Sequence, residues 1–364
     1  MEQAVAQAEQ HPITVSVVMP MYNAAVWLAE ALDSVLGQSL RHGVELSIFN
    51  DSSVDDSMGI IESYREKFLH RGIRLTVTDG GCVSGGDGCC RGPRGVGFAK
   101  NRAIEASCGE YLCFLDSDDV MSERRLEVQL AMAKEHRNDI IGSCFHRLPA
   151  MSTHRYTQWA CSLSHDQLQH QVYTSNGPTV VMPTWFCHRS VFERAGPFDE
   201  SGKGTPEDLL FFFSHLRHGG GVGRCDEDLL MYRYHENAAT FSINRETIFA
   251  ISLAELEQRV LATWPSFSIW NAGKLGRKFY RALCKQSRDK VVCFGDVDKK
   301  KLDLGSYTCV EVNERPYPCV PIRHFRQLRA PFVICMKQDL TGGAFEENLA
   351  SLHLTEGVDY VFFG

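Results

Sequence analysis

Strand-like and helix-like segments alternate along residues 14–119, and this alternation restricts the fold more than any other feature of the chain. The apolar, β-branched runs typical of strands are residues 14–20, 45–50, 73–78 and 111–115. Between them lie segments with apolar residues at helical spacing, such as residues 27–35 and 94–107. Strands separated by helices are typical of a parallel sheet wound in α/β fashion, and we predict that fold class.

The fourth of these strands runs into the sequence LDSDD, which places three carboxylates, Asp116, Asp118 and Asp119, within four residues. Their mutual repulsion would raise their pKa values unless a cation or hydrogen-bond donors lay among them. The Asp-X-Asp spacing suits a hard divalent ion, Mg²⁺ or Mn²⁺, which Asp118 would ligate while Asp116 holds ribose hydroxyls or metal-bound water. A solvated acidic turn, or the start of a helix over residues 122–130, is the alternative.

Polar residues follow three of the predicted strands. Because ligands of wound α/β sheets bind outside the carboxyl ends of the strands, these residues should share one edge of the sheet. The candidate binding residues on this edge are Pro20, Tyr22, Asn23, Asp51, Asp116, Ser117 and Asp118. The glycine-rich segment 80–95 indicates a mobile loop rather than a cofactor loop.

Composition narrows the class of protein. With 364 residues the chain is long enough for two domains, and it has no apolar run of 18 residues that would indicate a membrane span. The N-terminus carries acids where a signal peptide needs positive charge. The 14 cysteines form no CxxC pair, and several lie in apolar runs, which indicates reduced thiols. We therefore expect a cytoplasmic protein that does not enter a membrane.

A second acidic pair, Glu207 and Asp208, follows a Gly-Thr-Pro turn and opens a predicted helix. Either these carboxylates take part in a reaction, or they interact with the positive end of the helix dipole. Arg233 and His235 lie further downstream. Trp185 is either a surface on which a sugar or nucleoside stacks or a core residue.

The C-terminal part of the chain differs in charge. The whole chain has a net charge of −7, yet Trp264–Phe345 carries 15 Lys and Arg against 7 Asp and Glu, a local charge of +8. A strand at residues 267–270 is followed by Gly273 and Gly276 but by no complete GxGxxG, so dinucleotide binding is doubtful. We predict a flexible N-terminus (1–12), a main domain (13–245), a bridging helix (246–263) and a Rossmann-like accessory domain (264–364).

Five motifs in this order resemble the inverting family-two glycosyltransferases of the GT-A fold, over roughly residues 13–245. The motifs are PMYN, Asn50–Asp51–Ser52–Ser53, AKNRAI, LDSDD and EDLL. The resemblance implies a mostly parallel central sheet flanked by helices, a UDP-sugar donor and a divalent metal ion. One departure is that Asn-Asp-Ser-Ser stands where the family usually has Asp-Asp-Gly-Ser, so one acid and the turn glycine are absent.

The resemblance also implies a role for individual residues. Asp51 would accept the uracil N3 proton, Lys100 or Asn101 would hold the base or ribose, and Asp116 would contact ribose. Asp118 would ligate the metal, with His235 as a further ligand, and Arg233 or Arg94 would neutralise the leaving UDP. Asp208 would be the general base, with Glu207 orienting the acceptor or a metal-bound water.

Further phrases, among them SNGPTVVMPTWFC and FSIWNAGKLGR, resemble one vertebrate branch of this family. That resemblance implies transfer of galactose from UDP-galactose to queuosine in a tRNA anticodon loop. Basic residues of the accessory domain would then contact tRNA phosphates, or simply form a solvated helix face: Lys274, Arg277, Lys278, Arg281 and Lys285. The alternatives are a UDP-N-acetylglucosamine-using transferase with a protein or small-glycoside acceptor, and an inactive RNA-binding scaffold. The oligomeric state stays open.

Overall fold

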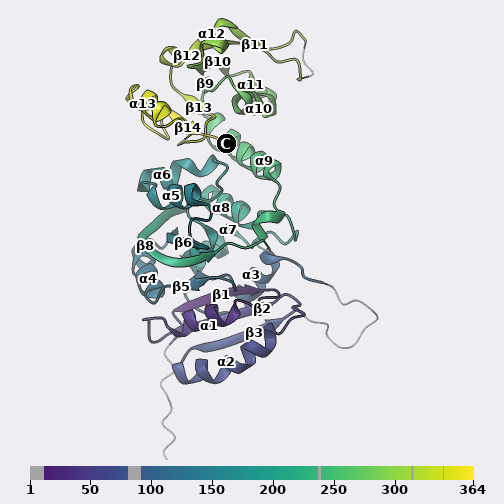
Figure 1. Ribbon diagram of the computed structural model, residues 1–364, viewed down its shortest axis with the longest axis vertical. Coiled ribbons are helices and arrows are strands. Elements are labelled where there is room, and N and C mark those ends of the chain that lie inside the picture. Colours follow the sequence, from purple (N-terminus) through teal and green to yellow (C-terminus); the bar gives the residue numbers. More distant parts are fainter. Residues whose placement is uncertain (1–11, 81–91, 237–238, 313–314, 339) are drawn as a thin grey trace, which may run out of the picture. The chain divides into compact units, whose positions relative to one another are not determined.

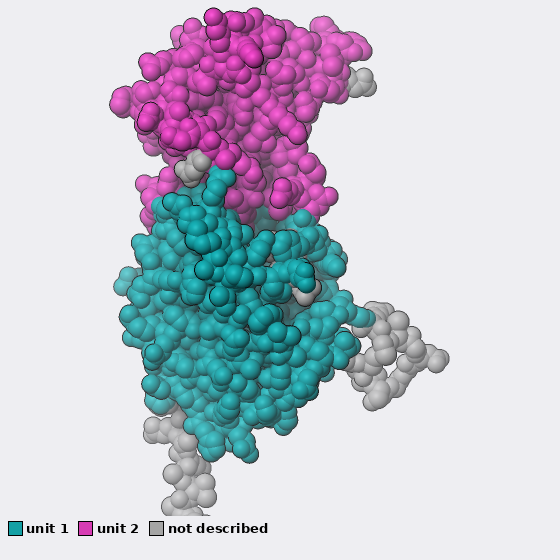
Figure 2. Space-filling view, in the orientation of Figure 1, with its two compact units in different colours: residues 1–163, 180–243 teal, residues 164–179, 244–364 magenta. Residues whose placement is uncertain are grey.

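The computed structural model describes residues 12–80, 92–236, 239–312, 315–338 and 340–364. The chain forms two compact units, coloured separately in Figure 2. The first comprises residues 1–163 and 180–243, and the second comprises residues 164–179 and 244–364. Residues 164–179 belong to the second unit, although the sequence pattern placed them in the main domain 13–245. Most of the predicted flexible N-terminus and most of the predicted mobile loop lie outside the described residues.

The first unit is built on an eight-stranded sheet with the order β3-β2-β1-β4-β7-β6-β8-β5 (Figure 1). Its first four strands are parallel, whereas β7 and β5 pair antiparallel with their neighbours. The strands are β1 (Val15–Met21), β2 (Val44–Asn50), β3 (Arg74–Asp79), β4 (Tyr111–Phe114), β5 (Val120–Met121), β6 (Asp139–Leu148), β7 (Phe186–His188) and β8 (Gly221–Arg233). The predicted α/β class with a mostly parallel central sheet is confirmed.

Helices connect these strands, as the alternating pattern predicted. They are α1 (Leu28–Leu36), α2 (Ser57–Arg71), α3 (Val96–Glu105), α4 (Arg125–Glu135), α5 (His154–Ser162), α7 (Arg189–Ala195) and α8 (Glu207–Arg217). Helix α1 buries the apolar face that its spacing predicted, and α2 ends where Gly72 adopts φ +73°. Helix α3 packs on β1 and β2 and also contacts α8. This packing brings the AKNRAI motif next to the acidic pair of α8.

The second unit contains a six-stranded sheet with the order β11-β12-β10-β9-β13-β14. Its strands are β9 (Phe267–Trp270), β10 (Val291–Asp296), β11 (Ser306–Thr308), β12 (Cys319–His324), β13 (Phe332–Ile334) and β14 (Tyr360–Phe362). All pairs are parallel except that of β11 with β12. Apart from the edge strand β11, the order is third-second-first-fourth-fifth along the chain, which is the order of a Rossmann fold.

The helices of the second unit are α6 (His165–His170), α9 (Arg245–Leu256), α10 (Lys274–Ala282), α11 (Lys285–Arg288), α12 (Lys299–Asp303) and α13 (Ala344–Ala350). A π-helical turn, Glu257–Leu261, continues α9. Short 3₁₀ turns lie at Gln171–Tyr173, Met182–Thr184, Ala239–Ser242 and Phe325–Gln327 along the chain. Gly276 allows α10 to approach β9, because a Cβ atom there would lie 1.8 Å from the carbonyl oxygen of Asn271.

The predicted basic face of the accessory domain differs from expectation. Helix α10 ends at Ala282 and Leu283 is extended, so Lys285 lies on the separate helix α11 and the basic residues do not share one helical face. Three of the five also have carboxylate partners: Lys278 pairs with Glu246, Arg281 with Glu311 and Lys285 with Asp289. These acids neutralise individual side chains of the predicted basic face.

Candidate active site

The LDSDD turn leaves the carboxyl end of β4 and gathers its three acids on one side. Leu115 continues the sheet by donating its N–H to the carbonyl of Val18, and the N–H of Asp119 bonds to the carbonyl of Asp116 at 3.2 Å, closing the turn. One carboxylate oxygen from each of Asp116, Asp118 and Asp119 lies within 4.8 Å of the others. These oxygens form an all-carboxylate donor set that suits a hard divalent cation.

The electrostatics of this cluster indicate a missing positive charge. Burial, followed by the charges of Asp118, Glu207 and Asp208, raises the pKa of Asp116 to about 6 against the opposing effect of Lys100. Burial and the neighbouring acids raise the pKa of Asp119 well above its ordinary value. One carboxylate oxygen of Asp119 is buried without a hydrogen-bond partner among the described residues. A bound cation would supply what these carboxylates lack, so the residues fit a metal ion.

Arg233, at the end of β8, holds the turn in place. Its N–H donates to Asp119 at 2.8 Å, its Nε donates to the carbonyl of Asp118 at 2.8 Å, and its Nη2 lies 2.9 Å from the Glu30 carboxylate. The guanidinium also lies 4.2 Å from the centre of the Trp27 ring. The structure therefore argues against the predicted contact of Arg233 with the leaving diphosphate, because its Nε and Nη2 bind the protein itself and only 6% of its side chain is exposed.

His235 lies two residues further along. Its Nε2 is 2.7 Å from a carboxylate oxygen of Asp118, and both side chains are only partly buried. A histidine at this distance can orient the carboxylate or share a cation with it. Its predicted role as a further metal ligand stays a prediction, and the geometry is compatible with it.

The acidic pair of α8 divides into one engaged and one available carboxylate. Glu207 is buried and accepts a hydrogen bond from Lys100 at 2.8 Å. Asp208 is half-buried, and one of its oxygens accepts the N–H of Leu209 at 2.7 Å. Burial and the charge of Glu207 raise the pKa of Asp208 to about 6, although Lys100 opposes them. Asp208 is therefore the better of the two for accepting a proton.

Lys100 is the counter-ion of both acidic groups. It is 2% exposed, and burial would lower its pKa, but the carboxylates of Glu207, Asp116 and Asp208 outweigh burial and raise it. The ammonium group is thus held charged between the LDSDD turn and α8. Contact with a base or ribose was the predicted role of Lys100; the structure instead engages its ammonium group in this buried ion pair.

Polar side chains in the loops after β1 and β2 accept backbone N–H groups from other segments. Each carboxylate oxygen of Asp51 accepts one backbone N–H, from Arg94 at 2.9 Å and from Gly95 at 2.7 Å. The side-chain oxygen of Asn23 accepts the N–H of Val54 at 2.8 Å. A carboxylate oxygen has more than one acceptor position, so the predicted contact of Asp51 with uracil stays a prediction. Pro20 is buried in β1, Tyr22 is exposed, and Ser117 is buried in the LDSDD turn.

Two predicted binding residues belong to the core. Asn101 is 1% exposed, and its amide exchanges hydrogen bonds with the backbone of Phe198, so it is not available to a donor. Trp185 has no exposed surface, donates its Nε1–H to Val180 and packs against Phe211. Of the two predicted roles of Trp185, the structure shows the core position, and a ring without exposed surface does not stack on a sugar or nucleoside. Arg94 is exposed, and its guanidinium lies over the Phe98 ring at 3.5 Å.

Beside these acids lies an aromatic and basic group that no sequence motif indicated. The guanidinium of Arg147 lies 3.6 Å from the centre of the Tyr232 ring, and its charge opposes the raised pKa of Asp119. Burial raises the pKa of Tyr156, and the charge of Asp208 adds to this effect. No sequence motif marks these three residues, because strands β6 and β8 and helix α5 meet only in the folded sheet.

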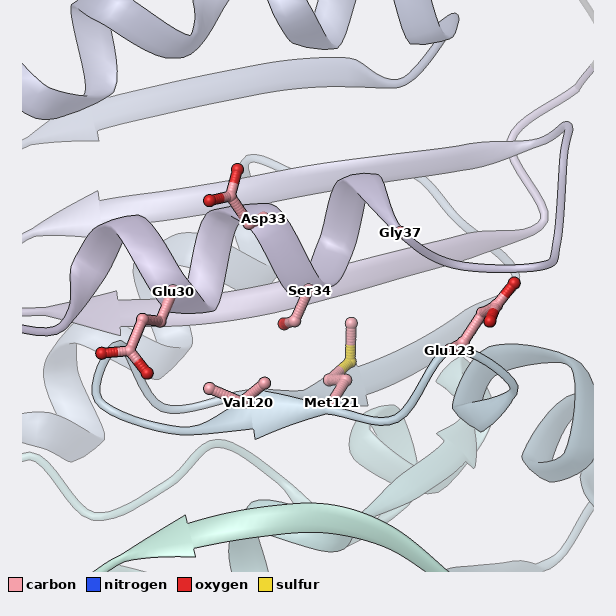
Figure 3. Close-up of a pocket in the computed structure, with 7 residues that line it drawn as sticks. All are labelled: Glu30, Asp33, Ser34, Gly37, Val120, Met121 and Glu123. Carbon is pink, nitrogen blue, oxygen red and sulfur yellow. The ribbon is translucent and has the colours of Figure 1, made fainter.

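Figure 3 shows a separate pocket of about 630 Å³ between α1 and β5. The side chains of Glu30 and Glu123 lie toward its two ends. None of the predicted site residues lines this pocket, and its acidic side chains would repel a diphosphate. We assign it no role in binding a donor.

The chain is similar to known glycosyltransferases in sequence. The sequence profile described as Glycosyl transferase family 2 matches residues 16–83 and 89–196. The uncharacterized glycosyltransferase EpsJ of Bacillus subtilis is 27% identical over 334 residues, which cover 86% of this chain and 89% of that protein. An uncharacterized glycosyltransferase of Rickettsia typhi is 30% identical over 237 residues, which cover 62% of this chain and 65% of that protein.

Solved structures with similar folds have low sequence identity. Staphylococcus aureus TarS (residues 1–349), in complex with UDP-GlcNAc, is 19% identical with a TM-score of 0.50, and 67% of each chain is covered. The Pyrobaculum calidifontis mannosyltransferase PcManGT, in complex with GDP-Man and Mn²⁺, is 17% identical with a TM-score of 0.51, covering 68% of this chain and 65% of that one. At this identity the likeness shows the fold. No helix in the described part of the chain is long and apolar enough to cross a membrane.

Proposed function

We propose that the chain is a member of glycosyl transferase family 2 and acts as a metal-dependent inverting transferase that uses a UDP-sugar donor. One observation carries this proposal. The buried ammonium group of Lys100 pairs with Glu207 of α8 at 2.8 Å, and the charges of Asp116 in the LDSDD turn and of Asp208 also raise its pKa. A metal-binding group and a proton acceptor therefore lie close to each other, as a sugar transfer requires.

The donor half of the proposed site is the LDSDD turn. Asp118 and Asp116 would hold Mn²⁺ or Mg²⁺, with Asp119 and His235 beside them. When bound, such an ion supplies positive charge to the diphosphate of the leaving group. Arg233 keeps the turn in place, because its Nε donates to the backbone carbonyl of Asp118 and its backbone N–H donates to the carboxylate of Asp119.

The acceptor half of the proposed site is Asp208. Inversion requires that the acceptor hydroxyl lose its proton as the oxygen attacks the sugar carbon opposite the leaving UDP. A carboxylate with a pKa of about 6 is mostly deprotonated at neutral pH and is a better proton acceptor than an ordinary aspartate. Glu207 is paired with Lys100, so it orients the neighbouring groups rather than taking the proton.

We further propose galactose as the sugar and queuosine in a tRNA anticodon loop as the acceptor. This part of the proposal is supported only by the resemblance of phrases such as residues 175–187 and 267–277 to one vertebrate branch of the family. The relative TarS carries the name of a poly(ribitol-phosphate) β-N-acetylglucosaminyltransferase, which favours UDP-N-acetylglucosamine as the donor to test in parallel.

The test combines purified protein, Mn²⁺, tRNA that contains queuosine, and labelled UDP-galactose or UDP-N-acetylglucosamine in separate reactions. We expect label to enter RNase-sensitive material from UDP-galactose. Matched tRNA that lacks queuosine is the control for the acceptor. Release of UDP without labelled RNA would support the transferase and reject the tRNA acceptor, whereas no release from either donor would contradict the proposed donors.

A further inference from the structure

We infer that a second surface, formed by Arg323, Arg326 and Arg329 of the second unit, binds the phosphodiester backbone of an RNA. The inference rests on the proposed tRNA acceptor and names a contact of that acceptor away from the reacting carboxylates. The three arginines, called the arginine rim below, line one cavity of about 760 Å³. They lie at the end of β12 and in the segment that leads from it to β13.

The arginine rim carries uncompensated positive charge. All three side chains are exposed, and none forms an ion pair with a carboxylate among the residues that the structure describes. No Asp or Glu is among the described residues that line the cavity. Guanidinium groups bind phosphate and carboxylate groups strongly. Three of them around one cavity, without carboxylate partners among the described residues, therefore indicate a ligand with several negative charges.

Four of the five basic residues that the sequence predicted as tRNA contacts have partners within the protein. Lys278, Arg281 and Lys285 each lie within 3.4 Å of a carboxylate oxygen, and Arg277 donates to the carbonyl of Ala272. A phosphate would have to displace these acids or add to their charge. The arginine rim has no such competitor, and it is therefore the better phosphate contact of the two.

The remaining lining of the cavity favours a nucleic-acid strand over a single small anion. Its floor is formed by side chains of β9 and β10, including the half-exposed Val292 and the buried pair Ser268 and Cys293. A site for one phosphate would draw its guanidinium groups inward and bury them, whereas these stay exposed around an open hollow. Phosphates that repeat along a strand fit separated arginines, and apolar surface between them fits sugar or base faces.

The experiment compares two triple variants of the full chain with the same change in charge. One is R323E/R326E/R329E, and the matched control is K278E/R281E/K285E. The affinity for a tRNA containing queuosine is measured over a range of salt concentrations. We expect the first variant to lose about tenfold or more in affinity and the slope of log K against log salt to fall by about 2, since three phosphate contacts are lost. The control should change affinity by less than about threefold.

A third variant, R323K/R326K/R329K, keeps the charge and should retain the salt slope, which separates lost contacts from lost folding. Wild-type affinity in R323E/R326E/R329E would overturn the inference, as would an equal loss in both glutamate variants, which would indicate only a change in overall charge. A further outcome would also overturn the inference. If UDP alone competed with tRNA for binding, and the arginine variant lost this competition, the cavity would be a site for a small nucleotide.

Measuring sugar transfer as well as tRNA binding distinguishes failure of this inference from failure of the proposed function. If tRNA binds through the arginine rim but receives no sugar, the inference stands and the proposed acceptor is rejected. If the wild-type protein transfers sugar to tRNA and R323E/R326E/R329E does so with unchanged KM, the proposed function stands and the inference is rejected.

Discussion

Both units place an aspartate at the carboxyl end of a parallel strand with a lysine nearby, yet the two aspartates have opposite electrostatics. In the first unit Asp116 shares one buried lysine, Lys100, with several other acids, and its pKa is raised. In the second unit Asp296 accepts bonds from Lys301 and from backbone N–H groups, including that of Ala272, and its pKa is lowered because these donors outweigh burial.

The comparison teaches that an acid at the end of a strand is not by itself a site. In a Rossmann fold an acid in this region typically binds ribose hydroxyls. The donors of the protein itself already occupy Asp296, so this carboxylate is satisfied without a ligand. The acids around Asp116 outnumber their donors, and such an imbalance is where a cation or a reacting proton is expected.

The largest effect should come from Asp208→Asn. Removing the proton acceptor should lower kcat by about 10²–10⁴-fold while the affinity for the UDP-sugar changes little. Asp296→Asn is the matched control in the second unit and should leave kcat within about twofold, because Asp296 acts on its own loop. Steady-state kinetics with both variants makes the test, and normal turnover of Asp208→Asn would reject the assigned base.

Lys100→Met should reduce stability next most strongly. It leaves Glu207 buried without a partner, which typically costs about 3–5 kcal/mol. Lys301→Met removes the corresponding lysine of the second unit but leaves Asp296 its backbone donors, so we expect about 1 kcal/mol. Chemical denaturation of both variants compares the two losses. Equal losses would contradict the difference between the two units.

His235→Ala should weaken metal binding rather than the chemical step. Loss of a group that orients a metal-ligating carboxylate typically costs about 10–100-fold in metal affinity. The measurement is the Mn²⁺ concentration at half-maximal UDP release, with His146→Ala as the control, because the acid that His146 contacts is the exposed Asp228, outside the LDSDD turn. An unchanged Mn²⁺ requirement with lowered kcat would place His235 in another role.

Acid should inactivate the enzyme at a higher pH than ordinary aspartates imply. The active form of Asp208 is the deprotonated one, and its pKa is raised to about 6, so protonation removes the base as the pH falls through 6. We expect kcat to fall about tenfold per pH unit below that value. The pH profile of kcat checks this, and a profile flat down to pH 4.5 would contradict the raised pKa.

The sequence predicted most of what depends on local pattern. Hydrophobic spacing predicts the order of strands and helices and the Rossmann-like second unit. Polar residues at strand ends predict the acids at the edge of the first sheet. The role of Trp185 stayed open and that of Asn101 was misassigned, because aromatic and amide side chains serve a core or a ligand equally well and only packing decides. The partners of Lys278 and Arg281 are about 30 residues away along the chain, so the local spacing of basic residues overstated the basic face.

The division of the second unit into two pieces has a consequence for the timing of synthesis. Residues 164–179 precede the end of the first unit, yet their partners come last: Gln171 bonds to Glu356, and the N–H of Gly364 bonds to the carbonyl of Tyr173. At about 5–20 residues per second, a ribosome needs roughly 10–40 seconds to add these partners. Throughout that interval a buried segment of the finished protein stays uncovered, and a chain that stops at residue 243 never covers it.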